Sequence, residues 1–320
     1  MVREYKIRKW LLIGGLLAVM LTGCGKSSKT PQDAVKKTAA YEMETVTSPE
    51  SNTLGGEWTV LALARSGAKV EDNYYEKYRA NLEKRVKEQE GVLSDNRYTE
   101  YSRVILTLTA IGDDPKDVAG YDLTKPLEDY DTVVSQGLNG AVFALLALNA
   151  DRLDVEGPLE KQYLDFILEK EKPEGGFSLN DQADTADVDI TAMTLACLEP
   201  YQQDKDIKET IEKGITFLAD AQDKDGGYTA YGTKSSESIS QTVIALSTYG
   251  VDCNEDSRFK KDGKGLYDRL MEFSTGDGGF AHIPKGEADP LATDQAFCAL
   301  AAYHRLLEKQ NSFYNMTDNK

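Results

Sequence analysis

Six short, nearly continuous runs of apolar residues recur along the chain, and their first residues lie 45, 40, 50, 48 and 54 positions apart. A period in this range is typical of repeat proteins, in which one unit cannot bury its own apolar face and must pack against its neighbours. The pattern therefore predicts six helical units around one shared core. The runs begin at Trp58, Arg103, Phe143, Met193, Gln241 and Gln295.

An amphipathic stretch precedes each apolar run. In the stretches 163–168 and 211–218 apolar residues fall three or four positions apart with Lys and Glu between them, which is typical of a surface helix. The runs themselves are apolar on nearly all sides, which is typical of a buried helix. We therefore expect an all-α (α/α)6 toroid, with six inner apolar helices inside six outer amphipathic ones. The outer stretches are 32–43, 73–89, 126–136, 158–171, 207–221 and 265–273.

Glycine pairs follow four of the outer stretches, and three of these pairs are followed directly by an aromatic residue. Glycine allows tight chain reversal, and the aromatic ring can fill the gap between neighbouring helices. The stretch from Lys213 to Tyr228 resembles the QW repeat of the terpene cyclase and protein prenyltransferase superfamily. The resemblance covers residues 32–310, and it implies the same α/α toroid.

The amino terminus predicts export and lipidation. Residues 1–9 are basic, and the apolar run that follows them is too short to span a bilayer comfortably, so we interpret residues 1–23 as a signal peptide. The alternative is an uncleaved anchor helix. The run ends in Leu21-Thr22-Gly23-Cys24, which resembles the bacterial lipobox and implies a lipid on Cys24. We expect an extracytoplasmic protein held on the cell membrane, with a polar tether at 24–31, the toroid at 32–310 and a polar tail at 311–320.

The charge limits the partners. Residues 1–23 contain four basic residues and one acid, so their removal takes the formal charge of the chain from −17 to −20. Such an acidic body repels phosphate backbones and anionic lipid. We expect no nucleic-acid partner, and membrane association through the lipid on Cys24 alone.

The cysteines and histidines give little support to a metal site. Cys197 and Cys298 lie within apolar runs and are expected to be small core residues. Protein prenyltransferases bind zinc through an aspartate, a cysteine two residues later and a distant histidine, whereas this chain has no Asp-x-Cys and only His282 and His304. We expect neither a metal nor a cofactor.

One short motif resembles that of an enzyme family. The run Asp187-Val-Asp189-Ile190-Thr-Ala is similar to the Asp-x-Asp-Asp-Thr-Ala motif of squalene-hopene-type cyclases, in which the middle aspartate is a general acid, and this implies that role for Asp189. Here Ile190 replaces the second of the adjacent aspartates, and the chain has no second toroid. The simpler alternative is that Asp187 and Asp189 cap the first turn of a helix.

The repeat register brings further polar residues to one end of the ring, which we call the mouth: the end at which the inner helices begin. Equivalent positions in a closed ring face the same end, and apolar walls with a few polar groups are typical of small-ligand sites. The alternative is that helix ends always cluster in a toroid and that the aromatic rings merely seal it. The candidate residues are Asp187, Asp189, Glu237, Ser240, Gln241, Asp294, Gln295, Phe177, Tyr228, Tyr231, Phe280 and His282.

We therefore expect a lipid-anchored, non-catalytic protein that binds a small, partly apolar ligand or an envelope protein. Two alternatives stay open. One is a terpenoid cyclase-like enzyme that uses Asp189 as general acid. The other is a cobalamin-carrier-like protein or an envelope scaffold.

Overall fold

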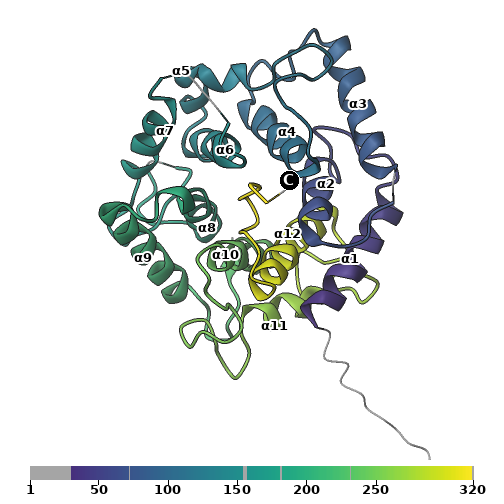
Figure 1. The fold of residues 1–320 in the computed structure, drawn as a ribbon. Helices are drawn as coiled ribbons and strands as arrows, with labels where there is room; N and C mark the ends of the chain where they lie inside the picture. Colours follow the sequence, from purple (N-terminus) through teal and green to yellow (C-terminus); the bar gives the residue numbers. More distant parts are fainter. Residues whose placement is uncertain (1–29, 72, 154–156, 181, 231, 319–320) are drawn as a thin grey trace, which may run out of the picture.

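The computed structural model describes residues 30–71, 73–153, 157–180, 182–230 and 232–318. In this part of the chain, the helices form the predicted ring of inner and outer helices (Figure 1). The inner helices are α2 (Glu57–Ser66), α4 (Tyr98–Ile111), α6 (Leu138–Asn149), α8 (Val188–Cys197), α10 (Ser236–Thr248) and α12 (Pro290–Leu307).

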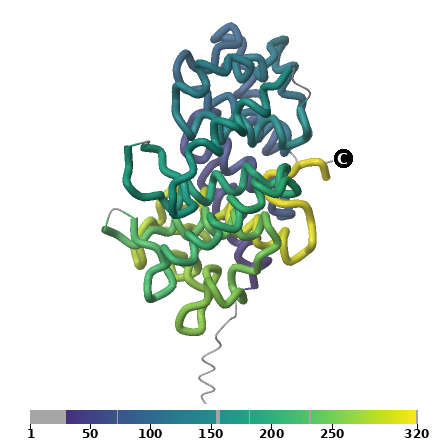
Figure 2. Tube along the Cα trace, turned by 90° about the vertical axis from the view of Figure 1, so that its left-hand side faces the viewer, coloured from purple at the N-terminus to yellow at the C-terminus, as the bar shows by residue number. Residues whose placement is uncertain are grey.

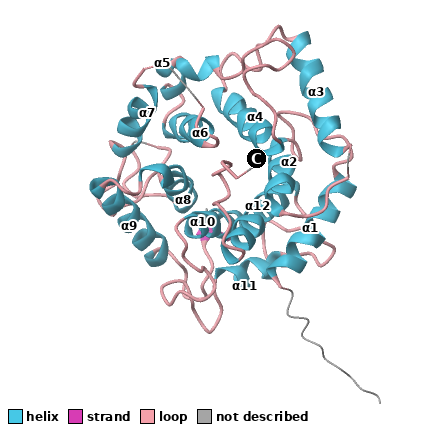
Figure 3. Cartoon of the chain, in the orientation of Figure 1, coloured by secondary structure: helices cyan, strands magenta, loops and turns pink. Residues whose placement is uncertain are grey.

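The outer layer is less regular than the inner one. Four outer elements are single helices: α1 (Pro31–Thr45), α3 (Tyr74–Glu88), α7 (Leu159–Leu168) and α9 (Lys205–Asp220). The third and sixth are broken into a short α-helix and a 3-10 turn: η1 (Lys125–Glu128) with α5 (Tyr130–Val134), and α11 (Leu266–Leu270) with η3 (Met271–Phe273). A further turn, η2 (Glu199–Tyr201), follows α8, and the described residues contain one small hairpin, β1 (Thr229–Ala230) and β2 (Thr233–Lys234) (Figure 3).

The ring closes because every inner helix packs against the next one and α12 packs against α2. Inner helices are buried along nearly their whole length; in α6, every residue from Gly140 to Leu148 is buried. Outer helices bury one face only. In α9, Ile207, Ile211, Ile215 and Leu218 lie on the buried face, and the side chain of Asp204 caps the first turn by accepting hydrogen bonds from two backbone amides.

The glycine pairs let the chain pass closely between helices. Gly278 has φ 127°, and a Cβ at this position would lie 2.6 Å from the backbone oxygen of Lys37 on α1. No other residue type fits there without displacing one of the two segments. Two residues later, Phe280 is fully buried, as the sequence pattern predicts for a ring that fills the gap between helices.

The C-terminal segment corrects one prediction. Residues 311–318, which we call the strap, were expected to be a polar tail, but Phe313, Tyr314 and Met316 are buried in the ring. The strap crosses the end of the ring at which the inner helices finish, opposite the mouth (Figures 1 and 2). The prediction of a polar tail is therefore wrong for these residues, because three apolar side chains among polar neighbours fold back onto the core.

Several predictions concern the amino terminus: the signal peptide at 1–23, the lipid on Cys24 and the start of the tether lie outside the described residues. Within the described residues, no helix is both long and apolar enough to cross a membrane. Cys197, Cys253 and Cys298 are buried and unpaired, which confirms that the two helical cysteines are core residues.

Candidate functional site

The mouth is built from one repeated position on the six inner helices. Trp58, Arg103, Met193, Gln241 and Gln295 are partly exposed, whereas the residues on either side of each are buried. The sixth member, Phe143, is 8% exposed, and its neighbours are 1% and 0% exposed. These six first residues of the apolar runs therefore face the inside of the ring on the mouth side, and together we call them the floor of the mouth.

Contacts between floor residues join different repeats. The amide Nε2 of Gln241 donates a hydrogen bond to Oε1 of Gln295 at 3.3 Å, so these equivalent residues of α10 and α12 meet as the register predicts. The rings of Trp58 and Phe143 lie 5.8 Å apart, although α4 stands between their helices in the ring order. The floor is therefore a mixed surface of aromatic rings, a thioether, amides and one guanidinium group.

The two aspartates at the start of α8 have different roles. Asp187 is the N-cap, and its Oδ1 accepts a hydrogen bond from the amide of Ile190 at 3.1 Å, which confirms the capping interpretation for this residue. Asp189 lies in the first turn, and its Oδ1 is buried without a hydrogen-bond partner. Burial raises the pKa of Asp189 to about 6, and the Ser238 hydroxyl partly offsets this rise.

The start of α10 adds a second carboxylate. Glu237 is buried, and its oxygens lie 2.8 and 2.9 Å from Nδ1 of His282, whose ring is more than half exposed. The hydroxyls of Ser235 and Ser236 donate to the same carboxylate at 3.1 and 3.2 Å. Glu237 is therefore a satisfied acceptor that holds His282 at the rim.

Asp294 is enclosed below the mouth, where it forms a separate acidic pair with Glu42. It is 1% exposed and accepts hydrogen bonds from the amide of Gly55 at 3.1 Å and from the hydroxyl of Thr59. Burial raises the pKa of Asp294 to about 6, and burial followed by the nearby charge of Asp294 raises the pKa of Glu42 to about 8. Ser240 is buried and donates to a backbone oxygen of its own helix. Neither Asp294 nor Ser240 faces the mouth as expected, because both side chains are enclosed by neighbouring helices.

The loop aromatics also differ from the prediction. Phe177, Tyr228 and Phe280 are at most 1% exposed, so their rings seal the gaps between helices and do not line the mouth. Their burial follows from their place directly after the glycine pairs, where the chain turns inward. Tyr231 lies outside the described residues.

Sequence reasoning missed a group of exposed apolar side chains around the mouth. Of the six large apolar residues that are well exposed in the described part of the chain, five lie in loops that enter an inner helix or in its first turn. They therefore lie on the mouth side of the ring, on loops or first turns that belong to α2, α4, α8 and α12. The sequence did contain a signal, because these apolar residues stand among polar loop residues. The signal was missed because they do not follow the helical period. These residues are Leu54, Val92, Leu179, Ile283 and Leu291.

The chemistry available at the mouth is binding and proton transfer. In the described chain, two buried polar atoms at the mouth lack a hydrogen-bond partner: Nε of Arg103 and Oδ1 of Asp189. Among the residues that the structure describes, no group of three or more His, Cys, Asp or Glu side chains is placed to hold a metal ion.

Comparison with known proteins agrees with the ring. A stretch of 137 residues, 42% of this chain, is 23% identical to drimenyl diphosphate synthase from Streptomyces showdoensis, and it spans a quarter of that protein's length. The model of the prenyltransferase alpha-alpha toroid domain matches residues 122–318, which include four of the six inner helices and the strap. The chain therefore belongs to the prenyltransferase alpha-alpha toroid domain family.

Proposed function

We propose that this protein is a lipid-anchored, extracytoplasmic binding protein that holds a small, partly apolar molecule at the mouth. The observation that carries the proposal is the convergence of six equivalent inner-helix residues on a partly exposed floor, with exposed apolar side chains around it. Apolar surface with a few polar groups that fix orientation is the usual composition of a small-ligand site.

The unpartnered polar atoms at the mouth narrow the chemistry of the ligand. Nε of Arg103 is a donor, and Oδ1 of Asp189 is an acceptor when ionised. A buried polar atom without a partner costs free energy, on the order of 1–3 kcal/mol. A ligand that supplies hydrogen-bonding groups to these atoms, while its apolar part covers Trp58, Phe143 and Met193, recovers that cost.

The proposed anchor is compatible with an accessible mouth. Helix α1 begins at the strap end. The charge of Asp33, in its first turn, lies close enough to Tyr267 to raise the pKa of that phenol, and the Tyr267 ring packs against Tyr303 near the end of α12. A lipid on Cys24 joined to α1 by a short tether therefore leaves the mouth facing away from the membrane. Growth of cells on a clickable fatty acid tests the anchor, because the label is expected on the wild-type chain and not on a Cys24→Ser variant.

Native mass spectrometry of the protein purified from its own membrane tests the ligand. Wild type is expected to retain a small molecule, and Met193→Lys is expected to lose it because a charge is placed on the apolar floor. Leu307→Lys is the matched control, since Leu307 is an exposed apolar residue at the opposite end of the ring. Absence of any bound molecule in wild type, or equal retention by both variants, contradicts the proposal.

A second candidate function is acid catalysis on an alkene by Asp189. It is favoured by the raised pKa of this buried carboxyl and by the similarity to drimenyl diphosphate synthase. A buried carboxyl with a pKa of about 6 is protonated in part of the molecules close to neutral pH, and this protonated form is available as a general acid. Incubation of wild type and Asp189→Asn with farnesyl diphosphate and with squalene tests this candidate. A cyclic product formed by wild type alone supports catalysis, and no product from either protein leaves binding as the function.

A further inference from the structure

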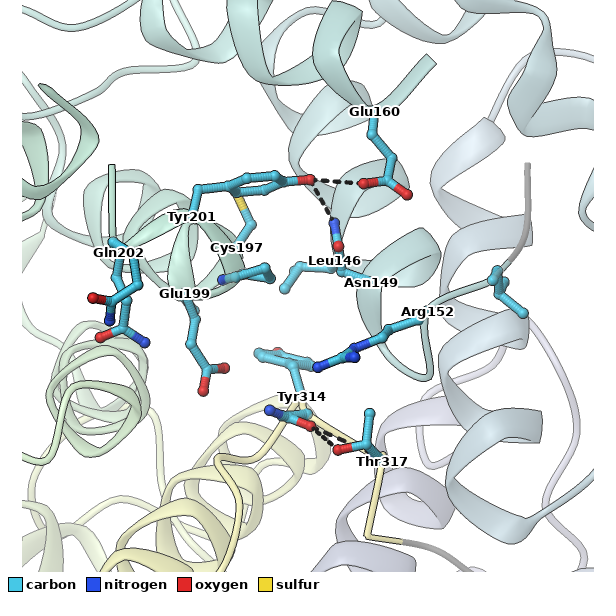
Figure 4. A pocket seen from close by; sticks show the side chains of 15 residues that line it. Leu146, Asn149, Arg152, Glu160, Cys197, Glu199, Tyr201, Gln202, Tyr314 and Thr317 are labelled. Atoms are coloured by element: carbon cyan, nitrogen blue, oxygen red, sulfur yellow. Dashed lines mark hydrogen bonds between the residues drawn. The ribbon is translucent and has the colours of Figure 1, made fainter. Parts of the chain in front are cut away.

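A cavity of about 620 Å³ lies at the strap end of the ring, away from the mouth (Figure 4). It is bounded by the last turns of α6 and α8, the turn η2, the first turn of α7 and the strap. Its volume is in the range of small-ligand sites. Its polar and aromatic lining includes Asn149, Arg152, Glu160, Glu199, Tyr201 and Tyr314.

Hydrogen bonds within the protein hold one wall of this cavity in place. The hydroxyl of Tyr201 donates to Oε2 of Glu160 at 3.2 Å and accepts from Nδ2 of Asn149 at 3.0 Å. Three helical elements, η2, α7 and α6, are thereby joined through one phenol group. Figure 4 shows this chain of contacts along one edge of the cavity.

The opposite wall is the strap, and buried groups hold it in place. The guanidinium of Arg65, which is 1% exposed, donates to the backbone oxygens of Ser312, Phe313 and Asn315 at 2.9, 3.0 and 2.7 Å. The hydroxyl of Ser312 donates to Oε2 of Glu199 at 2.5 Å. The strap therefore presents Tyr314 and Asn315 to the cavity in a fixed position.

The cavity also contains a cation, the guanidinium group of Arg152. The side chain of Arg152 makes no hydrogen bond or ion pair with any residue that the structure describes, and its φ of 53° lies in the left-handed region. Figure 4 shows its guanidinium group reaching into the cavity beside the ring of Tyr314. Two carboxylates, Glu160 and Glu199, also line the cavity, so donors and acceptors are both present.

We propose that this cavity binds a neutral polyhydroxylated ligand, with room for about two sugar rings. An anion would meet Glu160 and Glu199, and a cation would meet Arg152. Hydroxyl groups both donate and accept, so they can satisfy the guanidinium and the carboxylates together. The rings of Tyr201 and Tyr314 offer apolar faces on which the C–H faces of a sugar pack. The site is distinct from the mouth and does not depend on the function proposed there.

Titration of the full-length chain with maltose, cellobiose and N,N′-diacetylchitobiose tests the proposal. Saturation-transfer NMR detects binding and calorimetry gives the dissociation constant, in lauryldimethylamine oxide because this detergent has no sugar headgroup. At least one disaccharide is expected to bind. Arg152→Met is expected to weaken its binding about tenfold, the factor for one charge-assisted hydrogen bond, and Tyr201→Phe is expected to weaken it by a smaller factor.

Lys69→Met is the matched control, because it also removes an exposed positive charge beyond the end of an inner helix, outside the cavity. It is expected to change the dissociation constant less than twofold. Circular dichroism checks that Arg152→Met and Lys69→Met are folded. The proposal is overturned if none of the three disaccharides binds, if Arg152→Met and Lys69→Met bind alike, or if acetate or lysine competes at the same concentration as the disaccharide.

Discussion

The two ends of the ring are made from the same six inner helices, yet they differ in charge and in cover. At the mouth the first turns carry acids such as Glu57, Asp189 and Glu237, and exposed apolar loops surround them. At the strap end the last turns of α2 and α12 carry Arg65 and Arg305, and the strap covers them.

The helix dipole explains the sign of this difference. Backbone N–H groups without partners give a helix start a partial positive charge, and free carbonyl groups give its end a partial negative charge. Parallel inner helices add these partial charges at each end, which favours the acids in the first turns of α2, α8 and α10 and the arginines in the last turns of α2 and α12. Both arginines donate hydrogen bonds to backbone oxygens of the strap, which covers the ends of α2 and α12 and borders the cavity beside Tyr201.

Loss of Arg65, which holds the strap in place, is expected to have the largest effect on the strap end and on the free energy of unfolding. Arg65→Met leaves three strap carbonyl groups without their donor and leaves the carboxylate of Asp318 paired with Arg305. Removal of one partner from a buried ionic network costs about 3–5 kcal/mol. Chemical denaturation is expected to show this fall in the free energy of unfolding. Arg258→Met, which removes an exposed arginine, is expected to cost less than about 1 kcal/mol; equal losses for both variants would contradict the anchoring role.

The buried acidic pair below the mouth is expected to make stability depend on pH. The pKa of Glu42 is raised to about 8 in the fold, so the folded state binds a proton more tightly than the unfolded state does. Stability is therefore greatest below the ordinary pKa of a glutamate and falls as the pH rises through 8. Glu42→Gln is expected to remove this fall and to stabilise the protein at pH 9, by on the order of a few kcal/mol.

Denaturant unfolding at pH 7 and pH 9 measures the effect of Glu42→Gln, because the carboxyls of Asp189 and Asp294, whose pKa values are raised only to about 6, are mostly ionised at both pH values. The exposed Glu44 on the same helix supplies the control, because Glu44→Gln is expected to leave the pH dependence of wild type unchanged. A variant Glu42→Gln that still loses stability between the two pH values would show that another group is responsible.

The smallest expected effect concerns the cap of α8. Asp187→Ala removes the acceptor for the amide of Ile190, and loss of such a cap costs about 1 kcal/mol. Thermal unfolding followed by circular dichroism is expected to detect the loss. The exposed Asp184, three residues earlier, gives a control in which Asp184→Ala is expected to have no measurable effect. If both variants melt together, Asp187 is not the cap that fixes the start of this helix.

Sequence periodicity predicted the ring because an outer helix such as α9 is buried with the helical period, whereas an inner helix such as α6 is apolar and buried on nearly all sides. It did not predict the strap, since Phe313, Tyr314 and Met316 follow no period and lie among polar residues. The partners of the strap carried a signal: Arg65 and Arg305 follow apolar runs and require buried acceptors.

The candidate site was predicted in part. The register correctly brought Gln241 to Gln295, because equivalent residues on neighbouring inner helices meet. Register alone could not tell which side chains face inward at the mouth and which face a neighbouring helix, as Asp294 and Ser240 do. The cavity beside Tyr201 was also beyond sequence reasoning, because it joins segments that follow no repeat.

The proposed function requires a partly apolar molecule at the mouth, and the emission of Trp58 reports on such a molecule directly. The chain has two tryptophans, Trp10 and Trp58, so a protein that lacks the proposed signal peptide contains Trp58 alone. Titration of this protein with a lipid extract of its own cells is expected to give a saturable change in Trp58 emission that Leu307→Lys retains and Met193→Lys loses. An emission spectrum that does not change, or that changes equally in both variants, would contradict a ligand at the mouth.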